Sequence, residues 1–413
     1  MTEILFNLTS AELEKFITDM GQPRFRAKQI SEWLNRGAPD FASMKNLPES
    51  LREQLDATAR TLPVRIVQKL NSSDGQTTKF LLELNDGQRI ECVLMRTSYG
   101  NSVCVSSQAG CAMGCKFCAS TLLGLKRNLT AGEMYAQLLV ANWELRSKVE
   151  CINDNEPPSL CALRPSTYSE ATSHVVVMGT GEPLQNTENL FGFLERANRD
   201  LGIGWRRLTV STCGIVPGIR KLTEWGRPIN LAISLHAPND ELRSEIMPIN
   251  NKYKISDVLD AAFENADAHN RQLMIEYILL EVEERRAQSA SSAASRQSVE
   301  RRLQVEDIDN NEPPSLCALR PSTCRKAATR SSTSNCTPAQ AEELSALLAG
   351  RNCMVNLIPW NAVDERDFAP PSGNTVHRFQ DILIKNGIHT RIRRERGTDI
   401  GSACGQLRLR QDI

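Results

Sequence analysis

The stretch GCAMGCKFCAS (residues 110–120) carries three cysteines, Cys111, Cys115 and Cys118, in a C-x3-C-x2-C spacing. A structural zinc site closes with four ligands, usually supplied as two C-x2-C pairs. A four-iron cluster also has four corners, so three thiolates leave one iron open to a substrate or cofactor. The spacing therefore predicts a 4Fe-4S cluster that takes part in chemistry. A zinc ion completed by a distant ligand stays open as the alternative.

C-terminal to the cysteines, short apolar runs alternate with amphipathic helices. The runs are HVVVMG (174–179), RLTVST (207–212), NLAISL (230–235), LMIEYILL (273–280) and MVNLIP (354–359). Helical patterns between or after them cover 131–148, 187–200, 339–350 and 375–387. Continuous apolar strands alternating with helices indicate a parallel sheet covered by helices. The sequence predicts an α/β fold, a partial or whole (β/α) barrel, with its chemistry at the carboxyl ends of the strands.

N-terminal to the cysteines, residues 1–60 predict a small helical accessory domain. Thr9 and Glu12 form a capping box ahead of a helical apolar pattern. The basic side chains of PRFRAKQISEWL (23–34) are either a solvated helix face or an RNA contact. Residues 61–105 predict a β-rich connecting extension, because two apolar strands flank the Asp86-Gly87 turn. Residues 106–413 would then form the barrel.

Two segments interrupt the barrel pattern. NEPPSLCALRPST occurs at residues 155–167 and again, identically, at 311–323. The second copy lies in a Ser-, Ala- and Arg-rich stretch with weak apolar periodicity, which is typical of low order. We interpret the segments at about 149–171 and 284–335 as insertions unrelated to the chemistry. A paired binding motif is the alternative.

Composition limits the class of protein. The 413 residues predict two or three domains at about 150 residues each. The 49 basic and 49 acidic residues argue against a general polyanion binder, although local basic patches remain possible. No apolar run is long enough for a membrane span, and the start resembles no signal peptide, so we expect a cytoplasmic protein. In such a chain, thirteen cysteines favour metal binding or catalysis over disulfides.

A second motif follows the first apolar run of the barrel. VVVMGTGEPLQN (175–186) places Gly179, Gly181 and Glu182 directly after a predicted buried strand. Glycine lets the backbone approach a ligand closely, and the carboxylate could hold a cationic amino group. Alone, G-x-G-E also makes ordinary turns, and the signal gains weight only downstream of the cysteine motif.

Together these motifs resemble the radical-SAM RNA methyltransferases of the RlmN/Cfr type. The resemblance covers nearly the whole chain apart from the two inserted segments. It rests on PRFRAKQI (23–30), CVSSQAGCAMGCKFCAS (104–120), MGTGEPLQN (178–186), STCGIVPGIRKL (211–222), LAISLHAPND (231–240), MIEYILLE (274–281), VNLIPWN (355–361) and RGTDIGSACGQL (396–407). The chain departs from the family in its insertions, in Thr180, and in its short tail after CGQL.

The resemblance implies a partial radical-SAM barrel and a role for each matching residue. Cys111, Cys115 and Cys118 would ligate the cluster. The positions that would contact S-adenosylmethionine are Gly181, Glu182, Ser211, Ser234, Leu235, His236 and Asn361. Cys404 would carry the methyl group, Cys104 would be its partner thiol, and Glu91 would accept a proton. Two molecules of S-adenosylmethionine would be used per turnover. The reaction would pass through a covalent RNA adduct as an intermediate, and it would need a one-electron reductant such as flavodoxin.

The implied reaction is methylation of C2 of adenosine in 23S rRNA and tRNA. A Cfr-type enzyme, which methylates C8 with the same cysteines, is the alternative. A non-catalytic metal-containing RNA-binding protein is a third reading. Basic side chains that could contact RNA phosphates are Lys126, Arg127, Arg206, Arg207, Arg391, Arg393, Arg394 and Arg396.

Overall fold

The computed structural model describes residues 3–35, 38, 40–146, 171–281, 334–363, 365–393, 396–402 and 405–407. Both copies of the repeated NEPPSLCALRPST segment lie outside these ranges, as do Arg394 and Cys404. The predictions made for them therefore stay predictions.

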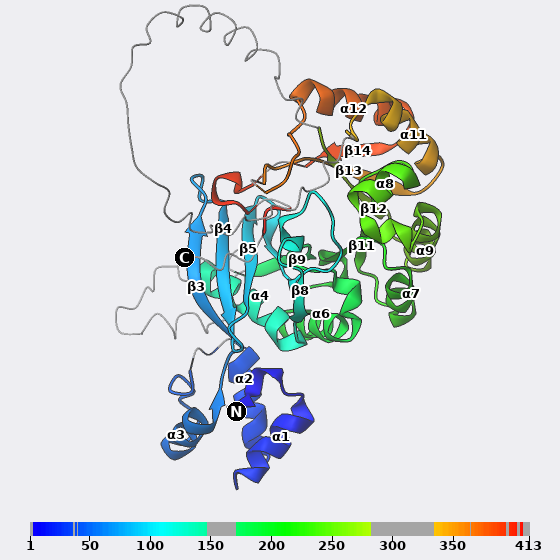
Figure 1. Cartoon of the computed structure of the whole chain (residues 1–413). Helices are drawn as coiled ribbons and strands as arrows, with labels where there is room; N and C mark the ends of the chain where they lie inside the picture. The colour runs from blue at the N-terminus through cyan, green and yellow to red at the C-terminus, as the bar shows by residue number, and fades with distance from the viewer. Residues whose placement is uncertain are drawn as a thin grey trace, which may run out of the picture.

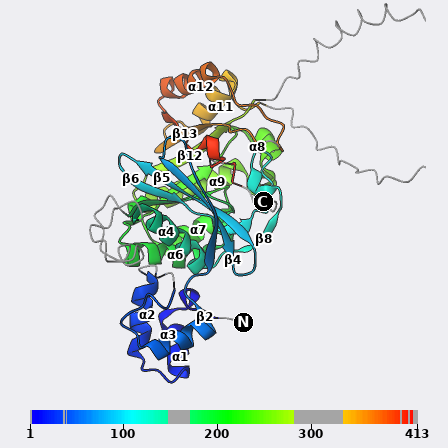
Figure 2. The same ribbon diagram turned by 90° about the vertical axis from the view of Figure 1, so that its left-hand side faces the viewer.

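The first residues form a helical lobe beside the main body (Figures 1 and 2). Its elements are β1 (Glu3–Ile4), α1 (Ser10–Asp19), α2 (Phe25–Asn35), α3 (Glu49–Thr58) and β2 (Ala59–Arg60). The capping box that starts α1 is confirmed: the Glu12 amide donates to Thr9 Oγ1, and the Thr9 amide donates to Glu12 Oε2 at 2.8 Å. The two short strands pair in parallel and bring both ends of the lobe together.

One ten-stranded sheet runs through the main body of the described chain. From edge to edge it contains β14 (His389–Ile392), β13 (Cys353–Pro359), β12 (Leu273–Leu279), β11 (Asn230–Ser234), β10 (Leu208–Thr212), β9 (Thr172–Val177), β6 (Gly100–Cys104), β5 (Arg89–Thr97), β4 (Thr77–Leu84) and β3 (Val64–Asn71). Neighbours from β14 to β6 are parallel, and those from β6 to β3 are antiparallel. The edge strands β14 and β3 do not pair with each other, so the sheet is an open, partial barrel with an antiparallel extension, as predicted.

Helices cover the outer face of the parallel strands (Figure 1). They are α4 (Ala131–Arg146), α6 (Thr187–Leu201), α7 (Val216–Trp225), α9 (Ile255–Ala268), α11 (Pro338–Leu348) and α12 (Gly373–Lys385). Helix α8 (Asp240–Ile246) instead packs with the cysteine loop through Leu242 and Ile246. Strand β9 shows how the faces divide: Val175 and Val177 join the main core, while Val176 packs on the inner side against Cys104 and its neighbours. The inner side is therefore left for the site.

A small hairpin displays the cysteine motif. Strands β7 (Gln108–Gly110) and β8 (Leu125–Asn128) pair antiparallel, and the loop between them contains all three cysteines. Among the residues described, no helix combines the length and the apolar character that crossing a bilayer requires.

Candidate active site

The three motif cysteines lie in the wall of one cavity at the carboxyl ends of the parallel strands. The same cavity is lined by Gly181, Glu182, Ser211, Ser234 and His236, which come from the ends of β9, β10 and β11. We call it the cysteine cavity. The fold thus brings together eight of the residues that the sequence predicted for cluster and cofactor binding.

Contacts from distant parts of the chain hold the cysteine loop in place. Trp360 Nε1 donates to the Phe117 carbonyl at 3.2 Å, and Arg366 Nη2 donates to the Cys118 carbonyl at 2.7 Å. The Ala119 amide donates to the Gly405 carbonyl at 2.8 Å. The loop is therefore held by residues that follow β13 and by Gly405, not only by its own hairpin.

The thiols of Cys111 and Cys115 are buried. Burial raises the pKa of Cys111 to about 12, and it raises the pKa of Cys115 well above its usual range. Without a metal they would stay neutral, whereas coordination deprotonates a thiol outright. In the described ranges, no three His, Cys, Asp or Glu side chains converge closely enough to bind one metal ion. A cluster instead takes each thiolate on a different iron, so this donor set fits a cluster better than a single zinc ion.

Glu182 is a rigidly held, buried carboxylate. It accepts hydrogen bonds from the Cys213 amide at 2.8 Å and the Leu184 amide at 3.0 Å, and it is 3% exposed. Burial raises its pKa, which the hydrogen bonds partly oppose. The side chains of Thr212 and Cys213 also hydrogen-bond to this carboxylate, so the protein itself holds most of its acceptor positions.

The backbone conformation at position 181 requires a glycine. The φ of Gly181 is +111°, and a Cβ there would lie 2.6 Å from Gln108 Cβ. Gln108 in turn accepts a hydrogen bond from the Glu182 amide at 2.8 Å. The glycine therefore lets the turn after β9 lie directly on β7, the strand that leads to the cysteines.

His236 contributes a neutral imidazole. The Ile278 amide donates to its Nδ1 at 3.0 Å, and its ring meets the Phe117 ring edge to face, with centroids 4.9 Å apart. Burial and the nearby Arg243 lower its pKa to about 3. It therefore presents a neutral ring to the cavity at ordinary pH. Ser211 and Ser234 lie on the neighbouring strand ends, with their hydroxyl oxygens 3.3 Å apart.

Two predicted cofactor positions lie outside this wall. The Leu235 side chain is fully buried in the main core and cannot reach the cavity. Its backbone amide donates to the Glu276 carbonyl on the neighbouring strand. Asn361 lines an adjoining cavity. For both residues the cofactor role stays a prediction.

Glu91 and Cys104 lie on the inner face of neighbouring strands. Glu91, on β5, is buried, and the Lys79 ammonium lies 3.0 Å from its carboxylate. Cys104, at the end of β6, is the register partner of Val93 on β5 and clusters with Leu407. Cys404 itself is outside the described residues, but the following residue, Gly405, lines the cysteine cavity.

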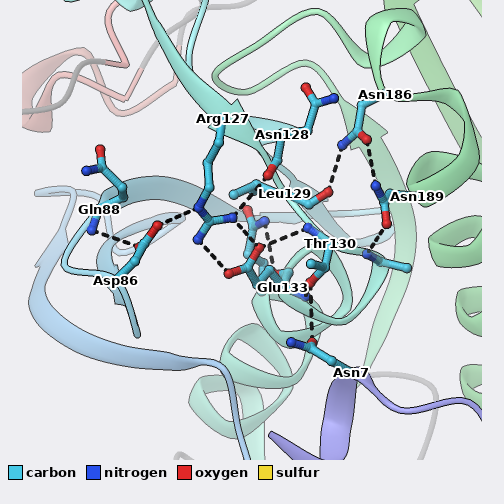
Figure 3. Close-up of polar contacts among 12 residues, drawn as sticks. Asn7, Asp86, Gln88, Arg127, Asn128, Leu129, Thr130, Glu133, Asn186 and Asn189 are labelled. Atoms are coloured by element: carbon cyan, nitrogen blue, oxygen red, sulfur yellow. Dashed lines mark hydrogen bonds and ion pairs between the residues drawn. The ribbon is translucent and has the colours of Figure 1, made fainter. Parts of the chain in front are cut away.

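The expectation for Arg127 is corrected. Its guanidinium forms ion pairs with Asp86 at 2.5 Å and with Glu133 at 2.8 Å, and Glu133 also accepts the Thr130 amide (Figure 3). These partners tie β8 to the β4–β5 turn and to the start of α4. Arg127 is thus already committed to internal ion pairs, and a phosphate contact is not its main role.

The other described basic candidates fall into three places. Lys126 is exposed on β8, the strand that follows the cysteine loop. Arg206 and Arg207 precede β10, at the amino ends of the parallel strands, opposite the cysteine cavity. Arg391, Arg393 and Arg396 line the adjoining cavity.

Some residues of the site were missed by the sequence analysis. Arg243 is fully buried and donates to the Cys213 carbonyl at 2.7 Å and to the Leu235 carbonyl at 3.0 Å. Lys79 and Cys213 likewise had no role assigned. Cys213 follows Ser211 in the STCG motif, which could have placed it in the wall; Arg243 and Lys79 carry no local sequence signal.

Fold and site define a radical-SAM enzyme. The crystal structure of a radical SAM methyltransferase from Sphaerobacter thermophilus matches this chain with a TM-score of 0.78 and 36% identity, covering 99% of this chain and 100% of that one. The fold prediction is thereby confirmed.

Sequence relatives narrow the class to a family. Residues 4–61 match the model of the ribosomal RNA large subunit methyltransferase N-terminal domain. A probable dual-specificity RNA methyltransferase RlmN from Clostridium acetobutylicum is 38% identical over 98% of this chain and 97% of its own length. Its namesake from Alkaliphilus metalliredigens is 39% identical over 98% of this chain and 94% of its own. The chain therefore belongs to the RlmN family of radical-SAM RNA methyltransferases, a family that implies S-adenosylmethionine and a 4Fe-4S cluster as cofactors.

Proposed function

We propose that this enzyme methylates C2 of adenosine in 23S rRNA and tRNA through a methylated cysteine and a covalent RNA adduct. The observation that carries the proposal is the position of residues 405–407, which directly follow Cys404 in the sequence. Gly405 lines the cysteine cavity, and Leu407 packs on Cys104, so these residues run between the predicted cluster ligands and the predicted partner thiol. The relatives' description as dual-specificity RNA methyltransferases supports two classes of RNA substrate.

The residues that would hold the two cofactors lie in the cysteine cavity, with Asn361 in the adjoining cavity and Leu235 behind the wall. Cys111, Cys115 and Cys118 would hold the cluster. Gly181, Glu182, Ser211, Ser234, His236, Asn361 and the backbone of Leu235 would hold S-adenosylmethionine. When bound, these groups supply methyl groups and a one-electron oxidant. A reductant such as flavodoxin would provide the electrons.

The target atom explains why a cysteine carrier is required. C2 of adenine is an sp2 C–H carbon without a usable lone pair, so it cannot displace a methyl group from a sulfonium as an ordinary nucleophile. Cys404 would take the methyl group first, at the cost of one S-adenosylmethionine. A second would be used to remove one hydrogen atom from that S-methyl group, so that its carbon can bond to C2. The RNA is then tied to the Cys404 sulfur.

Two residues on the inner face would finish the reaction. Glu91 would remove the C2 proton as general base, and Lys79 beside it offsets the cost of burying its charge. The Cys104 thiolate would then attack the Cys404 sulfur, breaking the bond from sulfur to the RNA-bound carbon and forming a disulfide. The electron pair of the broken bond stays with the carbon, which becomes the new methyl group on taking a proton. Two electrons restore both thiols.

Nucleoside analysis tests the proposal. The enzyme is reconstituted anaerobically with iron and sulfide and incubated with S-adenosylmethionine, reductant and either unmodified 23S rRNA fragments or tRNA. We expect 2-methyladenosine from both RNAs after digestion. Formation of 8-methyladenosine instead would assign the C8 reaction, and the absence of product from one RNA would remove the dual specificity.

A further inference from the structure

A second cavity adjoins the site, and of its lining only Asn361 has a predicted role in cofactor binding. It has a volume of about 480 Å³, within the range of about 300–1,000 Å³ that ligand sites span. Its walls come from the β5–β6 turn, the end of β13 and the stretch that includes and follows β14. We call it the arginine cavity.

The charge of its lining favours an anion. Arg391, Arg393 and Arg396 all border it, and no Asp or Glu from the described ranges does. Arg393 already has an ion-pair partner in Glu276 at 3.7 Å, so Arg391 and Arg396 carry the argument. Arg391 is exposed and makes no hydrogen bond or ion pair with the described part of the chain, whereas Arg396 donates to the Arg96 carbonyl at 3.2 Å. Met95, Val176 and other apolar side chains line it as well. A lining that combines apolar and cationic side chains suits a nucleotide, which has a flat base and a charged phosphate.

An aromatic ring completes the lining. Tyr99, in the β5–β6 turn, is 71% exposed, and its ring is held edge to face by His174, with centroids 5.7 Å apart. Bases stack on such rings whatever their identity, because every base has a π face.

The cavity is continuous with the site but offset from it. Ile358 and Arg393 line both cavities. Along β6, Tyr99 is five residues from Cys104, which at about 3.3 Å per residue is about 16 Å. A base on Tyr99 is therefore too far from Cys104 to be the one that reacts.

We infer that the arginine cavity holds the nucleotides that flank the target adenosine on an unpaired RNA strand, with Tyr99 stacking on one base and Arg391 and Arg396 contacting the phosphates. This inference rests on the proposed function for the identity of the target. It assigns part of the binding of single-stranded RNA to the arginine cavity, outside the cofactor site.

The test uses reconstituted enzyme and a fluorescein-labelled RNA stem–loop with an unpaired adenosine. Dissociation constants are measured by anisotropy for Tyr99→Ala, Tyr99→Phe and Arg391→Ala. The control is Arg220→Ala, since Arg220 is an exposed arginine of α7. Cluster absorbance of each variant checks that the fold is intact.

We expect Tyr99→Ala to weaken binding about tenfold, the loss of one base–aromatic stack, while Tyr99→Phe stays near wild type. Arg391→Ala should lower the slope of log K against log salt by about 0.7, the value for one contact to a single strand, and Arg220→Ala should not change it. Equal affinities for Tyr99→Ala and wild type, or an unchanged slope for Arg391→Ala, would overturn the inference. Tyr99-dependent binding without any methylated adenosine would instead refute the proposed function and leave the cavity's role standing.

Discussion

In the cysteine cavity the polar side chains are buried and already hydrogen-bonded, whereas the arginine cavity presents an exposed ring and cations at its rim. Glu182 and His236 each receive backbone amides, so their positions are set before any ligand arrives. Tyr99 and Arg391 are held by few contacts. The first arrangement suits a cofactor of constant shape, and the second suits an RNA strand whose sequence and shape vary. We therefore expect substitutions in the cysteine cavity to change catalysis, and substitutions in the arginine cavity to change RNA affinity.

The largest effect is expected from removing a cluster ligand. Cys111→Ala leaves two thiols in the loop, so we expect loss of the iron–sulfur absorbance and of all cleavage of S-adenosylmethionine, with RNA affinity kept within a few fold. Cys353→Ala is the control, because Cys353 is a buried cysteine of the main core at the start of β13. A Cys111→Ala enzyme that still cleaves S-adenosylmethionine would contradict the cluster assignment.

Glu91→Gln should lower the rate of RNA methylation by about 10²- to 10⁴-fold, the usual contribution of a general base. The amide keeps the size of the side chain but cannot take the proton. Binding of S-adenosylmethionine and RNA should change little, as measured by equilibrium titration. Glu83→Gln, which alters a carboxylate on β4 paired with Arg65, should leave the rate near wild type. Equal rates for the two variants would remove the base role of Glu91.

Gly181→Ala tests the pre-set geometry of the cysteine cavity. A φ of +111° costs a non-glycine residue about 1–3 kcal/mol, and the contact with Gln108 adds overpacking of similar size. Gly202→Ala is matched, because its φ is +67° with open space around it, and should cost only about 1–2 kcal/mol. Urea unfolding gives both costs. Equal costs would show that the turn after β9 can move away from β7.

The pH dependence of stability should carry a smaller signal from His236. Its folded pKa of about 3 lies below the usual value of 6.5, so the unfolded chain takes up a proton first as the pH falls. The stability due to the neutral ring is therefore full above pH 6.5 and falls by about 2 kcal/mol by pH 5. His236→Gln should flatten the curve of unfolding free energy between pH 7 and 5. Parallel curves for variant and wild type would show that the ring is not neutral in the folded state.

Much of the fold could be predicted because its signals are local. The strands of the parallel sheet are short apolar runs, and the Thr9 box starts α1 where the pattern places it. Strand β3 was missed, since its exposed residues alternate without a continuous apolar run. Strand β14 was missed because only four residues with an Arg-rich end carry it.

The cysteine cavity was also largely predictable, since its motifs follow strand ends that a parallel sheet brings to one edge. The arginine cavity was not. It is made by the β5–β6 turn, β14 and residues 396–402, which only the closure of the sheet brings together. The same holds for Lys79, which meets Glu91 across two antiparallel strands. It also holds for Arg243, whose guanidinium donates to four oxygen atoms, those of the Cys213, Ser234 and Leu235 carbonyls and of the Asn250 side chain. For Arg127 the sequence suggests a free surface charge, because its ion-pair partners Asp86 and Glu133 become evident only in the folded chain.

The most direct test of the central claim is the fate of RNA on a Cys104→Ala enzyme. Without the partner thiol, the bond between the Cys404 sulfur and the RNA-bound carbon cannot be resolved. The account predicts a covalent complex that survives denaturing gels and whose modified peptide contains Cys404. Free methylated RNA at the wild-type yield, with no such complex, would contradict it.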